Sequence, residues 1–235
     1  MTAGAPTAVD PGPVDPSMVA LRLSEVRRRI ASAGGGDRPI RIVAVTKGFG
    51  PDAVRAAMAA GVDDVGENYA DELVAKHAGA DVGAQSRWHF IGRVQRNKVK
   101  RLAPLVHLWQ TVDRSAAGQE IARRAPGARV LVQLNVTGQA GRNGCVPAEA
   151  PALVDELRAM ALDVVGLMAV GPAGPPEHAR AAYRDLAALA DRLELPERSM
   201  GMTDDLEVAV EEGTTMVRVG RALFGARSVP TDLRR

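Results

Sequence analysis

The chain of 235 residues is 46% hydrophobic, enough for one sizeable core, and its 30 lysine and arginine residues nearly balance 28 aspartate and glutamate residues. This balance argues against a dedicated nucleic-acid-binding protein, and no apolar run approaches the roughly 20 residues that cross a bilayer. The single cysteine, Cys145, excludes an internal disulfide framework and a multi-thiolate metal site, and it is typical of a protein from the reducing cytoplasm.

The first 16 residues are rich in proline, alanine and glycine and have neither the basic nor the apolar region of a signal peptide. We therefore expect residues 1–16 to form a disordered tail. Residues 17–36 then show apolar residues at helical spacing, which predicts a first helix that closes on glycines.

Strand-like and helix-like segments alternate along the rest of the chain. The strand-like runs span residues 40–46, 63–67, 87–92, 105–112, 128–136, 162–172, 198–202 and 215–220. Apolar runs joined by helices are typical of parallel strands covered on the outside. Eight such units predict one α/β domain at residues 17–228, a (β/α)8 TIM-type barrel with a C-terminal tail at 229–235. A doubly wound open sheet is the alternative, although five or six strands are more usual there.

The active site of such a barrel lies at the carboxyl ends of its strands, where this sequence places its unusual residues. Lys47 follows the first run, and Asn68 follows the second. The loops after the seventh and eighth strands, which contain Gly201 and Gly220, occupy the usual phosphate site of this fold. Glycines let the backbone approach an anion closely, so these loops predict a phosphate site, although ordinary tight turns explain each glycine equally well.

Lys47 has two interpretations. A lysine at a strand end is most often a solvated surface residue. When the lysine is partly desolvated, its pKa falls, and the neutral amine can attack a carbonyl to form a Schiff base. A phosphate site across the same barrel mouth favours the second interpretation, with either pyridoxal 5′-phosphate (PLP) or a sugar phosphate in an aldolase as the bound carbonyl compound.

Five segments, in order along the chain, resemble the PLP homeostasis protein family, once named for co-transcription with a proline synthetase gene. They are "AVTKGFG", "VGENYADEL", "WHFIGRVQRNK", "GLMAVGP" and "SMGMTDDLEVAVEEGTTMVRVGRALFG". Together they cover nearly the whole predicted domain. The resemblance implies the barrel of the alanine racemase N-terminal domain, with PLP as cofactor. Members of that family are generally taken to manage PLP supply and amino-acid balance, without an established robust catalytic activity.

The resemblance also implies roles for individual residues. It implies that Lys47 holds PLP as a Schiff base and that Asn68 lies beside the cofactor. The remaining implied contacts are the phosphate with Ser199, Gly201, Gly220 and Arg221, the pyridine nitrogen with Arg218, and the ring with Met200.

Two positions depart from the family pattern. Arg221 stands where a serine or threonine is common, so a hydroxyl contact to phosphate is lost, and its guanidinium either replaces that contact or points to solvent. Arg142 stands near a lysine that is usual in the family, which leaves the role of that loop open.

Residue chemistry favours a PLP carrier over a dedicated enzyme. Catalysis at the amino-acid α-carbon works best with a protonated pyridine nitrogen, usually opposite an aspartate, whereas Arg218 stays charged and accepts no proton. Alanine racemases, which this chain resembles, have the same arginine and still catalyse their reaction. They have in addition a second domain and a tyrosine base from the partner subunit. The tyrosines here are Tyr69 and Tyr183, and the second lies in a helical pattern. A small fold-type III enzyme, a weak racemase or transaminase, is the alternative, and an aldolase without PLP is a weaker one.

Other features predict no further site. Five basic residues between Arg93 and Arg101 are typical of a solvated helix face, and the scattered histidines show no metal-ligand spacing. We expect His89 to be a hydrogen-bonded residue inside the barrel and Glu67 to orient or pair with a lysine. The expected partners are PLP and PLP-dependent apo-enzymes, with no nucleic acid or membrane, and the expected state is a cytoplasmic monomer or dimer.

Overall fold

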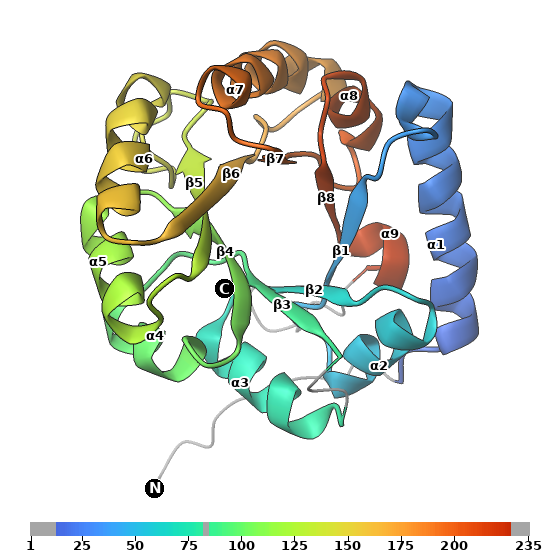
Figure 1. Ribbon diagram of the computed structural model, residues 1–235. Helices are drawn as coiled ribbons and strands as arrows, with labels where there is room; N and C mark the ends of the chain where they lie inside the picture. The colour runs from blue at the N-terminus through green and yellow to red at the C-terminus, as the bar shows by residue number, and fades with distance from the viewer. Residues whose placement is uncertain (1–12, 82–84, 227–235) are drawn as a thin grey trace, which may run out of the picture.

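The computed structural model describes residues 13–81 and 85–226, in which eight parallel strands close into a barrel in sequence order (Figure 1). The strands are β1 (Arg41–Val45), β2 (Asp64–Glu67), β3 (Arg87–Phe90), β4 (Val106–Val112), β5 (Arg129–Leu134), β6 (Asp163–Ala169), β7 (Glu197–Ser199) and β8 (Met216–Val219). Because β1 pairs with β8 as well as with β2, the sheet has no free edge. The predicted TIM-type barrel is confirmed, and the open sheet is excluded.

Helices follow the strands and surround the barrel, as Figure 1 shows in a view down its axis. They are α1 (Pro16–Ile30), α2 (Pro51–Ala59), α3 (Ala70–Gly79), α4 (Arg96–Leu102), α5 (Ser115–Arg124), α6 (Ala150–Ala159), α7 (Arg180–Arg192), α8 (Leu206–Glu211) and α9 (Arg221–Phe224). A π-helical turn, η1 (Ala31–Gly35), ends α1, and the 3-10 turns η2 (Pro147–Glu149) and η3 (Pro176–Ala179) precede α6 and α7.

Helix α1 lies outside the barrel and contacts α2, α8 and α9. Asp15 caps the helix by accepting a hydrogen bond from the Ser17 amide at 2.9 Å, and Pro16 occupies its first turn. Its buried side chains are Val19, Leu23, Val26 and Ile30, spaced as the sequence predicts. Residues 1–12 and 227–235 lie outside the described residues, so the predicted domain boundaries stay predictions.

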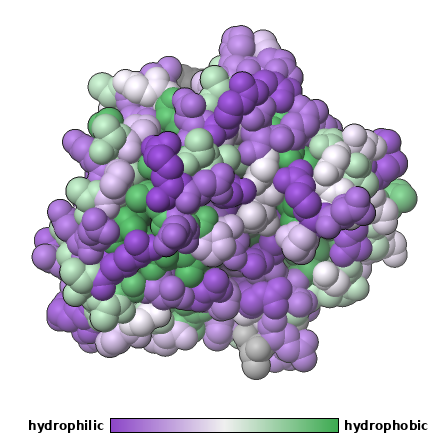
Figure 2. Space-filling view, turned by 45° about the horizontal axis from the view of Figure 1, so that its top comes forward, coloured by the Kyte–Doolittle hydropathy of each residue, from purple (hydrophilic) through white to green (hydrophobic). Residues whose placement is uncertain are grey.

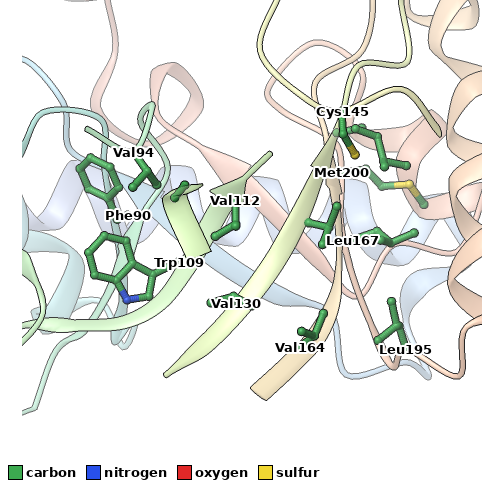
Figure 3. Close-up of a cluster of buried hydrophobic side chains, with 14 of the residues drawn as sticks. Phe90, Val94, Trp109, Val112, Val130, Cys145, Val164, Leu167, Leu195 and Met200 are labelled. Carbon is green, nitrogen blue, oxygen red and sulfur yellow. The ribbon is translucent and has the colours of Figure 1, made fainter. Parts of the chain in front are cut away.

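Side chains along each strand point alternately out to the helices and into the barrel. On β8, Val217 and Val219 pack outward with α1 and α2, whereas Met216 and Arg218 point inward. The largest apolar cluster lies between the strands and the helices from α2 to α8, and Figure 3 shows part of it around Trp109, Leu167 and Met200. This alternation decides which residue after each strand reaches the barrel mouth.

The surface turned to the viewer in Figure 2 is mostly hydrophilic, with hydrophobic residues in small patches between hydrophilic ones. Within residues 13–81 and 85–226, no helix combines the length and the apolar character that a membrane crossing needs. The same residues contain no group of three or more histidine, cysteine, aspartate or glutamate side chains placed to hold a metal ion.

Candidate functional site

A cavity of about 320 Å³ opens at the carboxyl end of the barrel. Its lining comes from both sides of the mouth and consists of Val45, Lys47, Asn68, Ile91, Met168, Val170, Met202, Thr203, Asp204, Arg218, Gly220 and Arg221. Pockets for small ligands start at about this size and combine apolar walls with a few placed polar groups. The cavity therefore suits a small ligand at the place where barrels of this kind carry their sites.

Lys47 reaches this cavity because of its position relative to β1. Val43 points into the barrel and Val45 lines the cavity, so Lys47, two residues further on, continues the inward series. Its side chain is half-buried. The strand therefore delivers a primary amine to the cavity wall.

A buried ion-pair cluster fixes the two residues that flank Lys47 in sequence. The ammonium of Lys76, on α3, donates to the Thr46 carbonyl at 2.7 Å and to Glu72 at 2.9 Å, and it also pairs with Glu67. Glu67 accepts from the Thr46 hydroxyl at 2.7 Å, and Glu72 accepts from the Gly48 amide at 2.8 Å. Lys76 thus holds Thr46 directly and Gly48 through Glu72.

Glu67 confirms the expectation that it pairs with a lysine, although its partner Lys76 carries no signal in the sequence that separates it from surface lysines. Burial raises the pKa of Glu67, and the hydrogen bonds and charge of Lys76 oppose that rise. Glu67 also accepts a hydrogen bond from the Asn68 amide at 3.2 Å. The same carboxylate therefore links the Lys47 loop to Asn68.

Asn68 lines the cavity just after β2, the strand that pairs with β1, and Gly92 fixes its backbone. A Cβ atom on Gly92 would lie 1.8 Å from the Asn68 carbonyl oxygen, which only glycine permits. Asn68 therefore lines the cavity, and its contact with a ligand stays a prediction.

Arg218 is 4% exposed and lies at the inner wall of the cavity. Its guanidinium donates to the Ser199 hydroxyl at 2.6 Å and to the Ala169 carbonyl at 2.7 Å. Burial lowers the pKa of Arg218, but an arginine stays charged at neutral pH even so. Among the ion pairs of the described residues none includes Arg218, so this buried cation faces the cavity without a bonded carboxylate.

The loops after β7 and β8 meet beside β1, where the sequence predicts a phosphate site. Gly220 is the N-cap of α9, and a Cβ atom there would come within 3.1 Å of the Val45 carbonyl. The Thr203 hydroxyl accepts a hydrogen bond from the Ala222 amide at 3.3 Å and joins this loop to the loop after β7. At the rim, the largely exposed Arg221 pairs with Asp204.

Ser199, Met200 and Gly201 are not among the lining residues, although the sequence predicts contacts for all three. Ser199 is fully buried in the barrel interior, where its hydroxyl donates to Gln110 at 2.7 Å. The Met200 side chain points outward into the apolar cluster of Figure 3. Gly201 has a φ of +92°, and its carbonyl accepts from the Arg218 amide at 3.0 Å. The predicted contacts of these three residues with a ligand stay predictions.

The next residues of this loop line the cavity instead, and the sequence argument missed them. Met202, Thr203 and Asp204 follow a glycine with positive φ, where the chain leaves the strand direction and strand alternation no longer applies. Ile91 and Val170, also missed, extend the inward alternation of β3 and β6. That alternation is a signal in the sequence that places both residues at the mouth.

The remaining expectations concern residues outside this cavity. His89 is fully buried inside the barrel and hydrogen-bonded, as expected. Cys145 is also buried, and burial raises its pKa to about 11, so it is no reactive thiol. Arg142 lines a neighbouring cavity of about 290 Å³ that shares Val170 with the first, and its guanidinium donates to the Gly171 carbonyl at 3.4 Å.

Comparison with known proteins identifies relatives along nearly the whole barrel. The pattern of the alanine racemase N-terminal domain family matches residues 20–228. The chain is 40% identical over 225 residues to the pyridoxal phosphate homeostasis protein of Pseudomonas aeruginosa, covering 90% of this chain and 96% of that one. It is 41% identical over 209 residues to the protein of the same name from Deinococcus radiodurans, covering 86% of this chain and 97% of that one.

Solved structures agree with this relationship. The structure of PipY from Synechococcus elongatus with PLP bound has a TM-score of 0.78 at 29% identity and covers 88% of this chain and 100% of that chain. The alanine racemase of Corynebacterium glutamicum has a TM-score of 0.69 at 19% identity and covers 94% of this chain but 64% of its own, so it shares the fold. The chain therefore belongs to the pyridoxal phosphate homeostasis protein family, within the wider family of the alanine racemase N-terminal domain.

Proposed function

We propose that this protein binds PLP in the cavity at the carboxyl end of the barrel, with Lys47 as its covalent anchor, and that it serves PLP supply and amino-acid balance. The observation that carries the proposal is the convergence of an amine, a buried guanidinium and two glycine-led loops in one cavity of about 320 Å³. When bound, PLP supplies an aldehyde that bonds to amines and a ring that withdraws electrons.

The donor set fits the parts of this cofactor. The amine of Lys47 replaces the aldehyde oxygen, which leaves as water, and a Schiff base results. The loops at residues 202–204 and 220–221 offer the Thr203 hydroxyl and backbone N–H groups to a phosphate. Arg221 shares its charge with Asp204 at the rim, so it adds less than an unpaired arginine would.

In this proposal, Arg218 determines whether the pyridine nitrogen of PLP is protonated. A guanidinium only donates hydrogen bonds and stays charged, so opposite the nitrogen it keeps that atom unprotonated. An unprotonated ring withdraws electrons weakly, which disfavours chemistry at the α-carbon of an amino acid. The residue therefore suits a protein that holds the cofactor more than one that drives rapid turnover.

The cavity also lacks a suitable second acid or base within the part of the chain that the structure describes. Its titratable lining residues there are Lys47, Asp204, Arg218 and Arg221, of which Asp204 pairs with Arg221. The Tyr183 hydroxyl is buried and donates to Asp205 at 2.6 Å, so it serves the scaffold. We therefore place a dedicated racemase or transaminase second to the carrier.

The anchor can be located chemically, because Lys47, Lys76, Lys98 and Lys100 are the only lysines of the chain. Borohydride reduction of the PLP-loaded protein, followed by peptide mapping, should place the pyridoxyl group on Lys47. Lys100→Ala, which removes an exposed lysine, is the matched control and should load fully. Label on Lys98 or Lys100 in place of Lys47 would contradict the proposed anchor.

A carrier and an enzyme differ in the fate of the bound PLP and of added amino acids. A carrier passes PLP to a PLP-dependent apo-enzyme and leaves D- and L-amino acids unchanged. Rapid exchange of the α-proton of an amino acid in deuterated water would instead favour the enzyme. We further propose that the protein acts in the cytoplasm as a monomer or dimer with apo-enzymes as partners, which size measurement and cross-linking would test.

A further inference from the structure

A chain of five buried polar side chains crosses the inside of the barrel, one from each of five strands. It starts at Arg218 on β8 and passes through Ser199 on β7, Gln110 on β4 and His89 on β3 to Asp64 on β2. Successive contacts measure 2.6, 2.7, 2.7 and 2.7 Å. Asp64 also receives two hydrogen bonds from Arg87, at 3.0 and 2.7 Å. The chain thus connects a cation at the cavity to a carboxylate deep in the barrel.

The two ends, together with a neutral His89, fix the direction of every hydrogen bond. Arg218 can only donate, so the Ser199 oxygen accepts and its proton goes to the Gln110 carbonyl oxygen. Asp64 as a carboxylate can only accept, so Nε2 of His89 carries a proton. A neutral His89 then accepts at Nδ1 from the Gln110 amide. Both ends require the same orientation of Gln110, and each donor points from Arg218 toward Asp64.

Burial favours the neutral imidazole that this order needs. It lowers the pKa of His89, and the charges of Arg41 and Arg87 act in the same direction. Hydrogen bonding to Asp64 opposes the shift. His107, on the neighbouring strand, lies 6.0 Å away between ring centroids and is also disfavoured as a cation by burial.

Arg218 donates two hydrogen bonds, one to the Ala169 carbonyl and one to the Ser199 hydroxyl. Only the second acceptor belongs to this series of buried side chains. Without an acceptor at Gln110, the Ser199 hydroxyl turns to another partner and its oxygen no longer faces the guanidinium. We propose that Gln110 and His89 are positioning residues that hold Ser199, and through it Arg218, in the orientation the ligand cavity needs. This role rests on the proposed function, in which Arg218 contacts PLP.

Two substitutions of Gln110 separate positioning from packing. Gln110→Met keeps the volume but removes the acceptor of Ser199, so we expect about a tenfold weaker PLP affinity, the effect of one lost hydrogen bond. Gln110→Glu keeps an acceptor for Ser199 and should bind PLP within about threefold of wild type. Its carboxylate also lies beside His89, which would then stand between two carboxylates and bind a second proton.

The matched control is Thr111→Val on the same strand. Thr111 is a buried residue that donates to the Gly92 carbonyl at 2.5 Å, and strand alternation turns it away from the barrel interior. This variant should lose stability comparably to Gln110→Met but keep its PLP affinity. A ¹⁵N NMR spectrum of the histidine side chains reports the chain directly, without PLP.

The proposal predicts a proton on Nε2 alone for wild-type His89 at pH 7.5 and protons on both ring nitrogens in Gln110→Glu. A proton on Nδ1 in the wild type would overturn it, as would equal PLP affinities in Gln110→Met and Thr111→Val. Weaker binding by Gln110→Glu than by Gln110→Met would show that packing matters instead. A wild-type protein that binds no PLP would contradict the proposed function and with it the role of Gln110, whatever the His89 tautomer.

Discussion

Replacing Lys76 by methionine keeps a long apolar side chain but removes the ammonium that Glu67, Glu72 and the Thr46 carbonyl share. The Lys76 and Glu67 side chains are 4% and 0% exposed, so water cannot compensate the carboxylate left behind. Removal of one partner from such a buried pair costs about 3–5 kcal/mol. We expect Lys76→Met to lower the free energy of unfolding by this amount at pH 8.

The loss should depend on pH in a defined direction. Burial already raises the pKa of Glu67, and without Lys76 the folded-state value rises further above the unfolded one. The folded variant then binds a proton that the unfolded chain does not, so its stability increases as the pH falls from 8 toward 5. Urea unfolding at both pH values, followed by circular dichroism, measures the difference.

A double variant, Glu67→Gln with Lys76→Met, is the control. Its amide carries no charge, so it should recover at least half of the stability that Lys76→Met loses at pH 8. A loss below about 1 kcal/mol at pH 8, or an equal loss at pH 5 and in the double variant, would refute the account of a buried ion pair. Slower PLP uptake by Lys76→Met would connect the cluster to the Lys47 loop.

Three other variants or conditions probe the site and its surroundings. Gly92→Ala forces a Cβ atom to 1.8 Å from the Asn68 carbonyl oxygen, so PLP titration should show a lower affinity and thermal melting a lower Tm. Gly79→Ala is the control, because its Cβ atom meets its neighbour at 3.5 Å, and it should change neither quantity. Burial lowers the pKa of His89, so the unfolded chain binds a proton that the folded one does not. The free energy of unfolding should therefore fall as the pH drops below about 6.5. His89→Gln should reduce this dependence on pH. Burial raises the pKa of Cys145 to about 11, so a thiol reagent at pH 8 should react slowly with the native protein and rapidly in urea, and equal rates would contradict the buried thiol.

The barrel and its mouth were predictable because they depend on local patterns. Apolar strands alternate with helices eight times, and strand alternation carries Lys47, Asn68 and Arg218 to the cavity. The polar residue after each strand is visible in the sequence itself. Those three residues therefore line the site where the sequence and the resemblance expect them.

The loop after β7 was less predictable because its path depends on packing. Gly201 adopts a φ of +92°, which ends strand alternation and brings Thr203 and Asp204 to the cavity while Met200 packs outward. The partner of Glu67 was equally hidden. Lys76 lies nine residues away on α3, and only the packing of that helix on the barrel shows that it is buried.

The hydrogen-bonded series from Arg218 to Asp64 inside the barrel could not be predicted from the sequence, because it also depends on packing. Gln110, His89 and Asp64 lie on three strands whose relative register sets their contacts, and a shift by one residue would turn each to the outside. The sequence around His89 predicted a buried, hydrogen-bonded histidine. The partners of His89, Asp64 and Gln110, could be identified only from the closed barrel.

The central claim is that Lys47 anchors PLP in this cavity, and the visible absorption spectrum of wild type beside Lys47→Ala after incubation with PLP and gel filtration tests it most directly. The account predicts a yellow wild-type protein with a visible Schiff-base band, and a Lys47→Ala variant that is folded by circular dichroism but lacks the band. A colourless wild-type protein that takes up no PLP, or a Lys47→Ala variant with the full band, would contradict it.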